Sequence, residues 1–123
     1  MSKPTILIVE DHNDFRHAVC DFITSSGINA NLVEASSGEE GVTVAHKTKP
    51  RLVLMDFWLR GINGVQAASK IKQDAPNCSI IMLSMFDAKD IHGLDKDKSI
   101  KTFISKSDLT EKLLPEIKKV LLC

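Results

Sequence analysis

The sequence has no excess of charge of either sign, because 16 Lys and Arg residues balance 16 Asp and Glu residues among 123. A protein that binds nucleic acid or a membrane surface with a whole domain usually carries a basic excess, so the composition supports neither role. No apolar run approaches the roughly 18 residues that span a bilayer, and the run Ile6–Val9 is too short for the core of a signal peptide. We therefore expect a cytoplasmic protein that contacts neither nucleic acid nor membrane directly.

Cysteine is also scarce. Cys20, Cys78 and Cys123 lie too far apart for any zinc-ligand spacing, and their odd number argues against a disulfide framework. We expect reduced thiols. The remaining composition, with 43% hydrophobic and 26% charged residues, is that of an ordinary globular protein. At this length, residues 1–123 are expected to form one domain.

Short apolar runs of strand length recur along the chain. Three of them are continuous rather than alternating, which is typical of strands that are covered on both faces of a sheet. Two others, the second and the fifth in chain order, are weaker. The five runs are Ile6–Val9, Ala30–Val33, Leu52–Met55, Ile80–Leu83 and Phe103–Ile104.

Segments with helical spacing fill the gaps between these runs. Apolar residues recur at helical positions over Phe15–Ile23, and Gly27 is placed to end that helix. Ser37 followed by Glu40 three residues later predicts a capping box at the start of a second helix.

The second half of the chain carries three further helical segments. A narrow apolar stripe over Val65–Ala75 ends before Pro76. The densely charged segment 87–98 has few apolar residues and only a faint helical pattern. The final segment, Leu109–Leu121, contains Pro115, so we expect either a late start or a kink in that helix.

Strands that alternate with helices indicate βαβ units with right-handed crossovers. The predicted fold is therefore α/β: a single three-layer domain with a five-stranded parallel sheet and helices on both faces. In such sheets a ligand binds at the carboxyl ends of the strands, where the strand order reverses.

Polar residues that could bind a metal ion or an anion follow the predicted strands. Three carboxylates in one small site repel one another unless a cation lies between them. Mg²⁺, which prefers oxygen ligands, is the natural partner, and a lysine with a hydroxyl would complement an anion beside it. The strand-end residues are Glu10, Asp11, Asp56, Ser84, Ser105 and Lys106.

The chain resembles the receiver domain of two-component response regulators over essentially its whole length. The segments that carry the resemblance are Ile6–Asp11, Leu52–Gly64, Ile80–Ser84 and Phe103–Lys106. The resemblance implies a flavodoxin-like fold and a phosphorylation-controlled switch. Its partners would be a sensor histidine kinase or phosphotransfer protein, and a downstream effector domain or protein.

The resemblance also implies a role for individual residues. Asp56 would be the phosphoacceptor and would attack a phosphohistidine of the partner. Lys106 would pair with the phosphoryl oxygens, and Ser84 would hydrogen-bond the attached phosphate. Phe103 would occupy the aromatic switch position. Such a domain catalyses its own phosphoryl transfer and is not a turnover enzyme on an external substrate.

The cofactor implied by the resemblance is Mg²⁺. Asp11 and Asp56 would ligate it directly, together with the backbone carbonyl of Trp58, while Glu10 would act mainly through water. None of the four histidines has ligand spacing, so His12 and the others are expected on the surface or within helices.

Four features depart from the usual receiver pattern. Arg60 replaces a common proline, Met85 replaces a small residue and would crowd the phosphate site, and Ser107 replaces a proline that is often cis. The charged segment 87–98 lacks the usual small residues. None of these departures is expected to touch a metal ligand.

Three other functions could in principle be served by the same fold. An aspartyl-phosphate hydrolase would need a second Asp where Trp58 stands. A nucleotide- or flavin-binding module would offer backbone amides to phosphate, yet the first loop offers Glu10 and Asp11. A receiver-like interaction domain that acts without phosphorylation stays open because of Met85 and Arg60.

Overall fold

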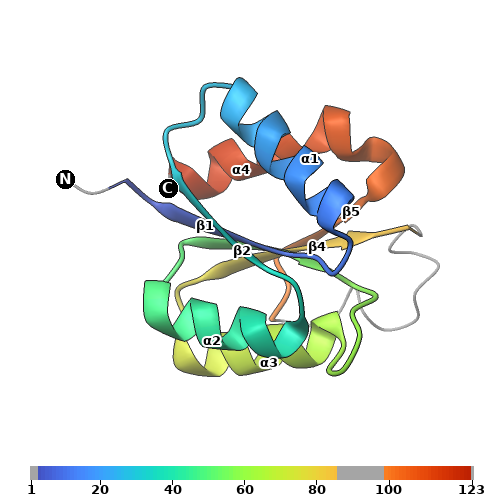
Figure 1. Ribbon diagram of the computed structural model, residues 1–123. Helices are drawn as coiled ribbons and strands as arrows, with labels where there is room; N and C mark the ends of the chain where they lie inside the picture. The colour runs from blue at the N-terminus through green and yellow to red at the C-terminus, as the bar shows by residue number, and fades with distance from the viewer. Residues whose placement is uncertain (1–2, 86–98, 123) are drawn as a thin grey trace.

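A computed structural model describes residues 3–85 and 99–122, in which strands and helices alternate (Figure 1). None of the helices in these two ranges is long and apolar enough to cross a membrane. The elements are β1 (Thr5–Val9), α1 (Asn13–Ser25), β2 (Asn31–Ala35), α2 (Gly38–Thr48), β3 (Leu52–Asp56), α3 (Gly64–Asp74), β4 (Ser79–Ser84), β5 (Thr102–Ser105), the 3-10 turn η3 (Lys106–Asp108) and α4 (Leu109–Leu121).

The five strands form one parallel sheet in the order β2-β1-β3-β4-β5. This confirms the predicted fold class. The chain first builds outward from β1 to β2 and then returns to place β3 on the other side of β1. The strand order therefore reverses between β1 and β3, which is where a doubly wound sheet forms its ligand crevice.

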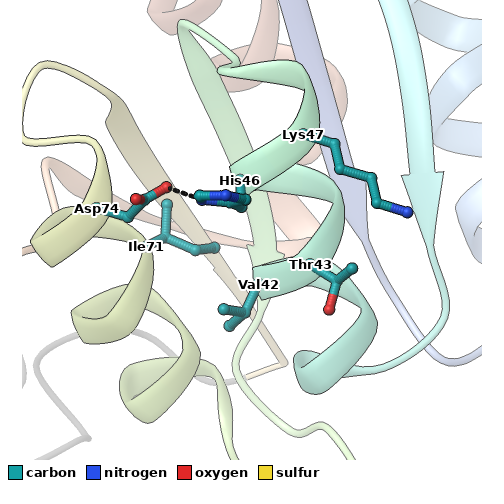
Figure 2. Close-up of a pocket in the computed structure, with 6 residues that line it drawn as sticks. All are labelled: Val42, Thr43, His46, Lys47, Ile71 and Asp74. Atoms are coloured by element: carbon teal, nitrogen blue, oxygen red, sulfur yellow. Dashed lines mark hydrogen bonds and ion pairs between the residues drawn. The ribbon is translucent and has the colours of Figure 1, made fainter.

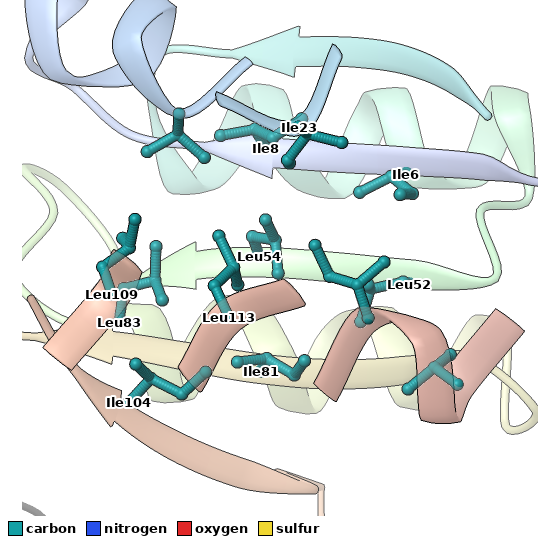
Figure 3. Close-up of a cluster of buried hydrophobic side chains, with 13 residues drawn as sticks. Ile6, Ile8, Ile23, Leu52, Leu54, Ile81, Leu83, Ile104, Leu109 and Leu113 are labelled. Carbon is teal, nitrogen blue, oxygen red and sulfur yellow. The ribbon is translucent and has the colours of Figure 1, made fainter. Parts of the chain in front are cut away.

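Helices cover both faces of the sheet, with α1 and α4 on one face and α2 and α3 on the other (Figure 1). Successive side chains of a strand point to opposite faces, so Ile6 and Ile8 pack on the α1–α4 side while Leu7 and Val9 pack on the α2–α3 side. This explains why the strands are continuously apolar. Figure 3 labels the main residues of the α1–α4 side: Ile6, Ile8, Ile23, Leu52, Leu54, Ile81, Leu83, Ile104, Leu109 and Leu113.

The edge strand β2 is displaced from its predicted range, Ala30–Val33, and runs over Asn31–Ala35. Asn31 and Glu34 of β2 are exposed, Leu32 and Val33 are partly buried, and Ala35 is buried. An edge strand has a partner on one side only, so its sequence carries less of the continuous apolar signal that located the central strands.

Two helix starts are capped by side chains. At α2 the Ser37 hydroxyl accepts a hydrogen bond from the Glu40 backbone N–H at 3.1 Å, as predicted, but the Glu40 carboxylate accepts one from the Ser36 hydroxyl instead of closing the box. A complete capping box stands at α3, where Asn63 and Gln66 bond reciprocally. That second box was not predicted.

Helix α4 runs from Leu109 to Leu121 with Pro115 inside it, so of the two predicted alternatives the late start is wrong, while a kink stays a prediction. Proline removes one intrahelical hydrogen bond and crowds the preceding turn. The helix compensates by burying Leu109, Leu113 and Ile117 against the sheet, each of which contributes about 1.5–3 kcal/mol. The predicted helical segment at 87–98 lies outside the described residues.

Substitution of Gly64 by alanine should disturb the end of β3. A Cβ atom at Gly64 would lie 2.5 Å from the Asp56 carbonyl oxygen and 3.0 Å from the Met82 sulfur. Because backbone cannot yield as a flexible side chain does, we expect Gly64→Ala to cost about 1–3 kcal/mol of unfolding free energy and to shift the Asp56 and Phe57 amide resonances. Urea unfolding and NMR measure both effects. Val65→Ala is the comparison, since it loses packing one residue further on; similar Asp56 shifts in both variants would contradict the steric account.

Candidate functional site

The register of the sheet brings the predicted strand-end residues to one edge. Val9 of β1 lies opposite Met55 of β3, so Glu10 follows beside Asp56. On the other side of β3, Ser84 of β4 lies opposite Ser105 of β5, and Lys106 follows directly. The edge lies at the point where the strand order reverses.

Lys106 lies between two buried carboxylates. Its Nζ atom is 2.9 Å from Glu10 Oε1 and 3.2 Å from Asp56 Oδ1. Glu10 is only 1% exposed and Asp56 only 2%. An unpaired buried charge carries a large desolvation cost. The Lys106 ammonium offsets this cost for both carboxylates.

The aromatic ring of Phe15 supports the same ammonium group. Lys106 Nζ lies 4.4 Å from the centroid of the ring, within range of a cation–π interaction. Phe15 belongs to the first turn of α1. The sequence presented it only as an apolar residue of that helix, so its role in holding Lys106 was missed.

Arg16 fixes the backbone at the end of β1. Its Nη1 atom donates to the Glu10 carbonyl oxygen at 2.8 Å, and its Nε atom donates to Glu34 Oε1 of β2 at 2.9 Å. The guanidinium therefore joins the loop after β1 to the neighbouring strand. Spacing alone gave no sign of this contact, because it joins residues 18 positions apart.

Two basic side chains reach Asp11, of which His12 is exposed as expected. His12 Nδ1 lies 3.1 Å from Asp11 Oδ1 and 3.3 Å from Glu10 Oε2, so His12 belongs to the site. Arg60 Nε lies 3.4 Å from Asp11 Oδ2. The prediction that no departure from the receiver pattern touches an expected metal ligand is therefore wrong for Arg60. The reason is geometric, since the loop after β3 folds back over the end of β1.

The environment shifts the ionisation of three groups. Burial and the nearby charge of Glu10 raise the pKa of Asp56 to about 6, although Lys106 opposes the shift. Burial alone would also raise the pKa of Asp11, but its interactions with Glu10, His12 and Arg60 hold it below 3.8. Burial would lower the pKa of Lys106, but Glu10 and Asp56 outweigh that effect and raise it above 10.5.

The donor set fits a hard divalent cation. Asp11 Oδ1 and Asp56 Oδ1 are buried oxygen atoms without a hydrogen-bond partner, although each lies within ion-pair range of a basic side chain. Glu10, Asp11 and His12 each offer a ligand atom, all within 4.8 Å of one another. Carboxylate oxygens that lack hydrogen bonds are what a cation such as Mg²⁺ would satisfy.

The other predicted site residues differ in burial and in position. Ser84 is fully buried at the end of β4, while Phe103 of β5 is half-buried and packs on the α2–α3 side of the sheet. Trp58 is 58% exposed, and its ring meets that of Phe57 edge-on, with centroids 4.7 Å apart. Met85 is 72% exposed.

A separate hollow of about 360 Å³ between α2 and α3 contains none of these residues. Its rim carries an ion pair in which His46 Nδ1 of α2 lies 3.0 Å from Asp74 Oδ2 of α3 (Figure 2). Lys49, just after α2, reaches the same carboxylate at 2.9 Å. These contacts join the two helices and are remote from the strand ends that carry the acidic cluster.

Comparison with known proteins identifies relatives over nearly the whole chain. The family model of the response regulator receiver domain matches residues 6–118. Response regulator protein VraR of Staphylococcus aureus is 28% identical over 115 residues, which cover 93% of this chain and 54% of VraR. The chain thus spans about half the length of the curated relatives it matches.

Solved structures agree with this fold. A LuxR-family two-component response regulator from Aurantimonas sp. SI85-9A1 has a TM-score of 0.86 at 24% identity, covering 98% of this chain and 86% of its own. Response regulator protein TrrA from Thermotoga maritima, in complex with Mg(2+)-BeF, has a TM-score of 0.84 at 24% identity, covering 96% and 99%. Because the family model spans most of the sequence and the sheet has the fold of these neighbours, this chain belongs to the response regulator receiver domains of two-component signalling.

Proposed function

We propose that Asp56 accepts a phosphoryl group from a phosphohistidine of a sensor histidine kinase or phosphotransfer protein in the cytoplasm. The observation that carries this proposal is the placement of Asp56. Its carboxylate is buried at the end of the central strand β3, 3.2 Å from the Lys106 ammonium, with one oxygen that makes no hydrogen bond.

The proposed chemistry needs little more than positioning and charge neutralisation. An Asp56 oxygen attacks the phosphorus atom, the bond between phosphorus and the partner's imidazole nitrogen breaks, and the imidazole departs. The carboxylate must be ionised to attack, and a pKa of about 6 leaves it largely ionised at neutral pH. Lys106 already lies beside the Asp56 carboxylate that would receive the phosphoryl group.

Asp11 and Asp56 would hold Mg²⁺ directly, because each has a buried oxygen without a hydrogen bond. The carbonyl of Trp58 is proposed as a third ligand, and Glu10 is proposed to act through water. When bound, Mg²⁺ supplies positive charge beside the phosphoryl oxygens. The relative TrrA, which shares this fold, was solved with Mg²⁺ and a beryllofluoride, which supports the same assignment here.

Ser84 and Phe103 are proposed to transmit the signal. A phosphoryl group adds about −1.5 to −2 charge and three acceptor oxygens, which would draw the Ser84 hydroxyl toward Asp56 and leave Phe103 to repack on the α2–α3 side. The surface that changes would then meet an effector domain or protein. We expect residues 1–123 to act as one domain, and to transfer phosphate only onto and off themselves rather than turn over an external substrate.

No observation favours the other functions considered. The carboxylates and the lysine that phosphoryl transfer needs are together, so a receiver that never accepts phosphate has no support in the described residues. A hydrolase would need a second carboxylate two residues after Asp56, and that position holds the exposed Trp58. That the Met85 side chain crowds the phosphate site and thereby slows the loss of the phosphoryl group stays a prediction.

Incubation with Mg²⁺ and a small phosphodonor such as acetyl phosphate should add one phosphoryl mass that is lost at alkaline pH. Asp56→Asn should abolish the addition, because an amide cannot form the acyl phosphate. Asp21→Asn removes an exposed carboxylate of α1 and should label normally. Intact-protein mass spectrometry measures all three chains; undiminished labelling of Asp56→Asn would refute the assignment.

Lys106 and Ser84 should act at different steps. Lys106→Ala removes the charge beside Asp56 and should slow labelling on the order of a hundredfold. Ser84→Ala should still accept phosphate but fail to switch, as read from NMR shifts at Phe103 when beryllofluoride is added. Ser79→Ala, at the other end of β4, is the matched control. If Ser84→Ala shows the wild-type shifts at Phe103, the switch role is wrong.

Asp56 should lower the stability of the metal-free protein as the pH rises. Its folded-state pKa of about 6 exceeds the ordinary value of 3.8, so between these values the folded chain binds more protons than the unfolded chain. The loss of folding stability is absent below pH 3.8 and complete above pH 6, where it is on the order of 3 kcal/mol. Asp56→Asn should therefore gain stability over wild type as the pH rises from 4 to 7, measured by urea unfolding in EDTA. A difference that does not change with pH would contradict this.

A further inference from the structure

The Arg60 side chain reaches over the acidic cluster from the loop between β3 and α3. Its guanidinium Nε lies 3.4 Å from Asp11 Oδ2, and the two side chains differ greatly in exposure, at 86% for Arg60 and 9% for Asp11. The contact therefore joins a solvent-facing cation to the rim of a buried acidic site.

The backbone directly after Arg60 is held in place. The Ile62 N–H donates to Glu39 Oε1 at 2.8 Å, which ties the loop to the first turn of α2. Gly61 adopts φ +76° directly after Arg60, and a Cβ atom there would collide with the Glu39 carboxylate. This anchored turn presents the Arg60 side chain to the end of β1, and the side chain itself is exposed to solvent.

The cations of the chain already balance much of the charge at the site. Lys106 pairs with Glu10 and Asp56, and Arg60 pairs with Asp11. Three carboxylates thus face two permanent positive charges. The Asp11 oxygen that Arg60 approaches belongs to the carboxylate whose other oxygen is buried without a hydrogen bond.

We propose that Arg60 is a counter-ion of the Asp11 carboxylate that competes electrostatically with Mg²⁺ and is displaced when the metal binds. This rests on the proposed function insofar as the metal serves phosphorylation. The ion pair stabilises the metal-free site, and it raises the Mg²⁺ concentration at which the domain becomes competent to accept phosphate.

The expected size of the effect follows from the exposure of the guanidinium. An ion pair with one solvent-exposed partner is worth little, and its removal should tighten Mg²⁺ binding by about two- to fivefold. Because salt screens exposed charges, the gain should shrink at high ionic strength. In the absence of metal, Arg60→Ala should have a lower melting temperature than wild type. Addition of Mg²⁺ should raise the melting temperature of Arg60→Ala by more than it raises that of wild type.

The test is a Mg²⁺ titration of wild type, Arg60→Ala and Lys47→Ala, followed by Trp58 fluorescence and by the amide resonances of Asp11 and Asp56. Lys47 is an exposed lysine in the last turn of α2 that points away from α3 in Figure 2. Its replacement changes the net charge equally, so it controls for long-range charge effects. Arg60→Ala should bind more tightly than both other chains.

The Arg60 Nε–Hε resonance gives a direct readout. In wild type it should move when Mg²⁺ is added, toward the position seen in metal-free Asp11→Asn. The inference is overturned if this resonance stays still while Asp11 and Asp56 titrate, or if Arg60→Ala binds Mg²⁺ no more tightly than Lys47→Ala. Absence of Mg²⁺ binding in every chain would overturn it together with the metal assignment. Tighter binding by Arg60→Ala without labelling of Asp56 would uphold it and refute the phosphoacceptor proposal alone.

Discussion

The site depends on one ammonium group that is shared by two buried carboxylates. Glu10 and Asp56 are almost completely buried, and Lys106 lies within 3.2 Å of both. Without that cation, two adjacent negative charges would have to be removed from water at great cost. The Phe15 ring of α1 makes a cation–π contact with the same ammonium. Helix α1, the ends of β1 and β3, and the turn after β5 must therefore all be in place for the cluster to form.

The parallel sheet meets this requirement through its register. Because β1, β3 and β4 are covered on both faces, a shift of one strand by a single residue would reverse which side chains face which helices. The apolar core therefore fixes the strand ends, and the strand ends position the carboxylates. Asp56 consequently combines a fixed position with a pKa raised to about 6, and strongly perturbed pKa values of this kind cluster at functional sites.

The sequence predicted the elements whose signal lies in local periodicity. The central strands, the order of helices and the convergence of Glu10, Asp56 and Lys106 follow from apolar runs and from the rules of parallel sheets. Features that depend on a long side chain crossing between elements were not predictable. Arg60 on Asp11, a contact between residues 49 positions apart, requires the path of a loop rather than a pattern of residues. The final helix was predicted with Pro115 inside it, and it does not start late because packing against the sheet outweighs local helix preference.

The ionisation of Asp56 tests the coupling among Glu10, Asp56 and Lys106 most directly. A carbon-13 NMR titration of the Asp56 carboxyl in EDTA should show a pKa near 6, well above the ordinary 3.8. Lys106→Ala should raise that pKa further, because the nearest positive charge is lost, and saturating Mg²⁺ should lower it in wild type. If the pKa of Asp56 lies near 3.8 and changes neither with Lys106→Ala nor with Mg²⁺, Lys106 is not shared between Glu10 and Asp56 as described.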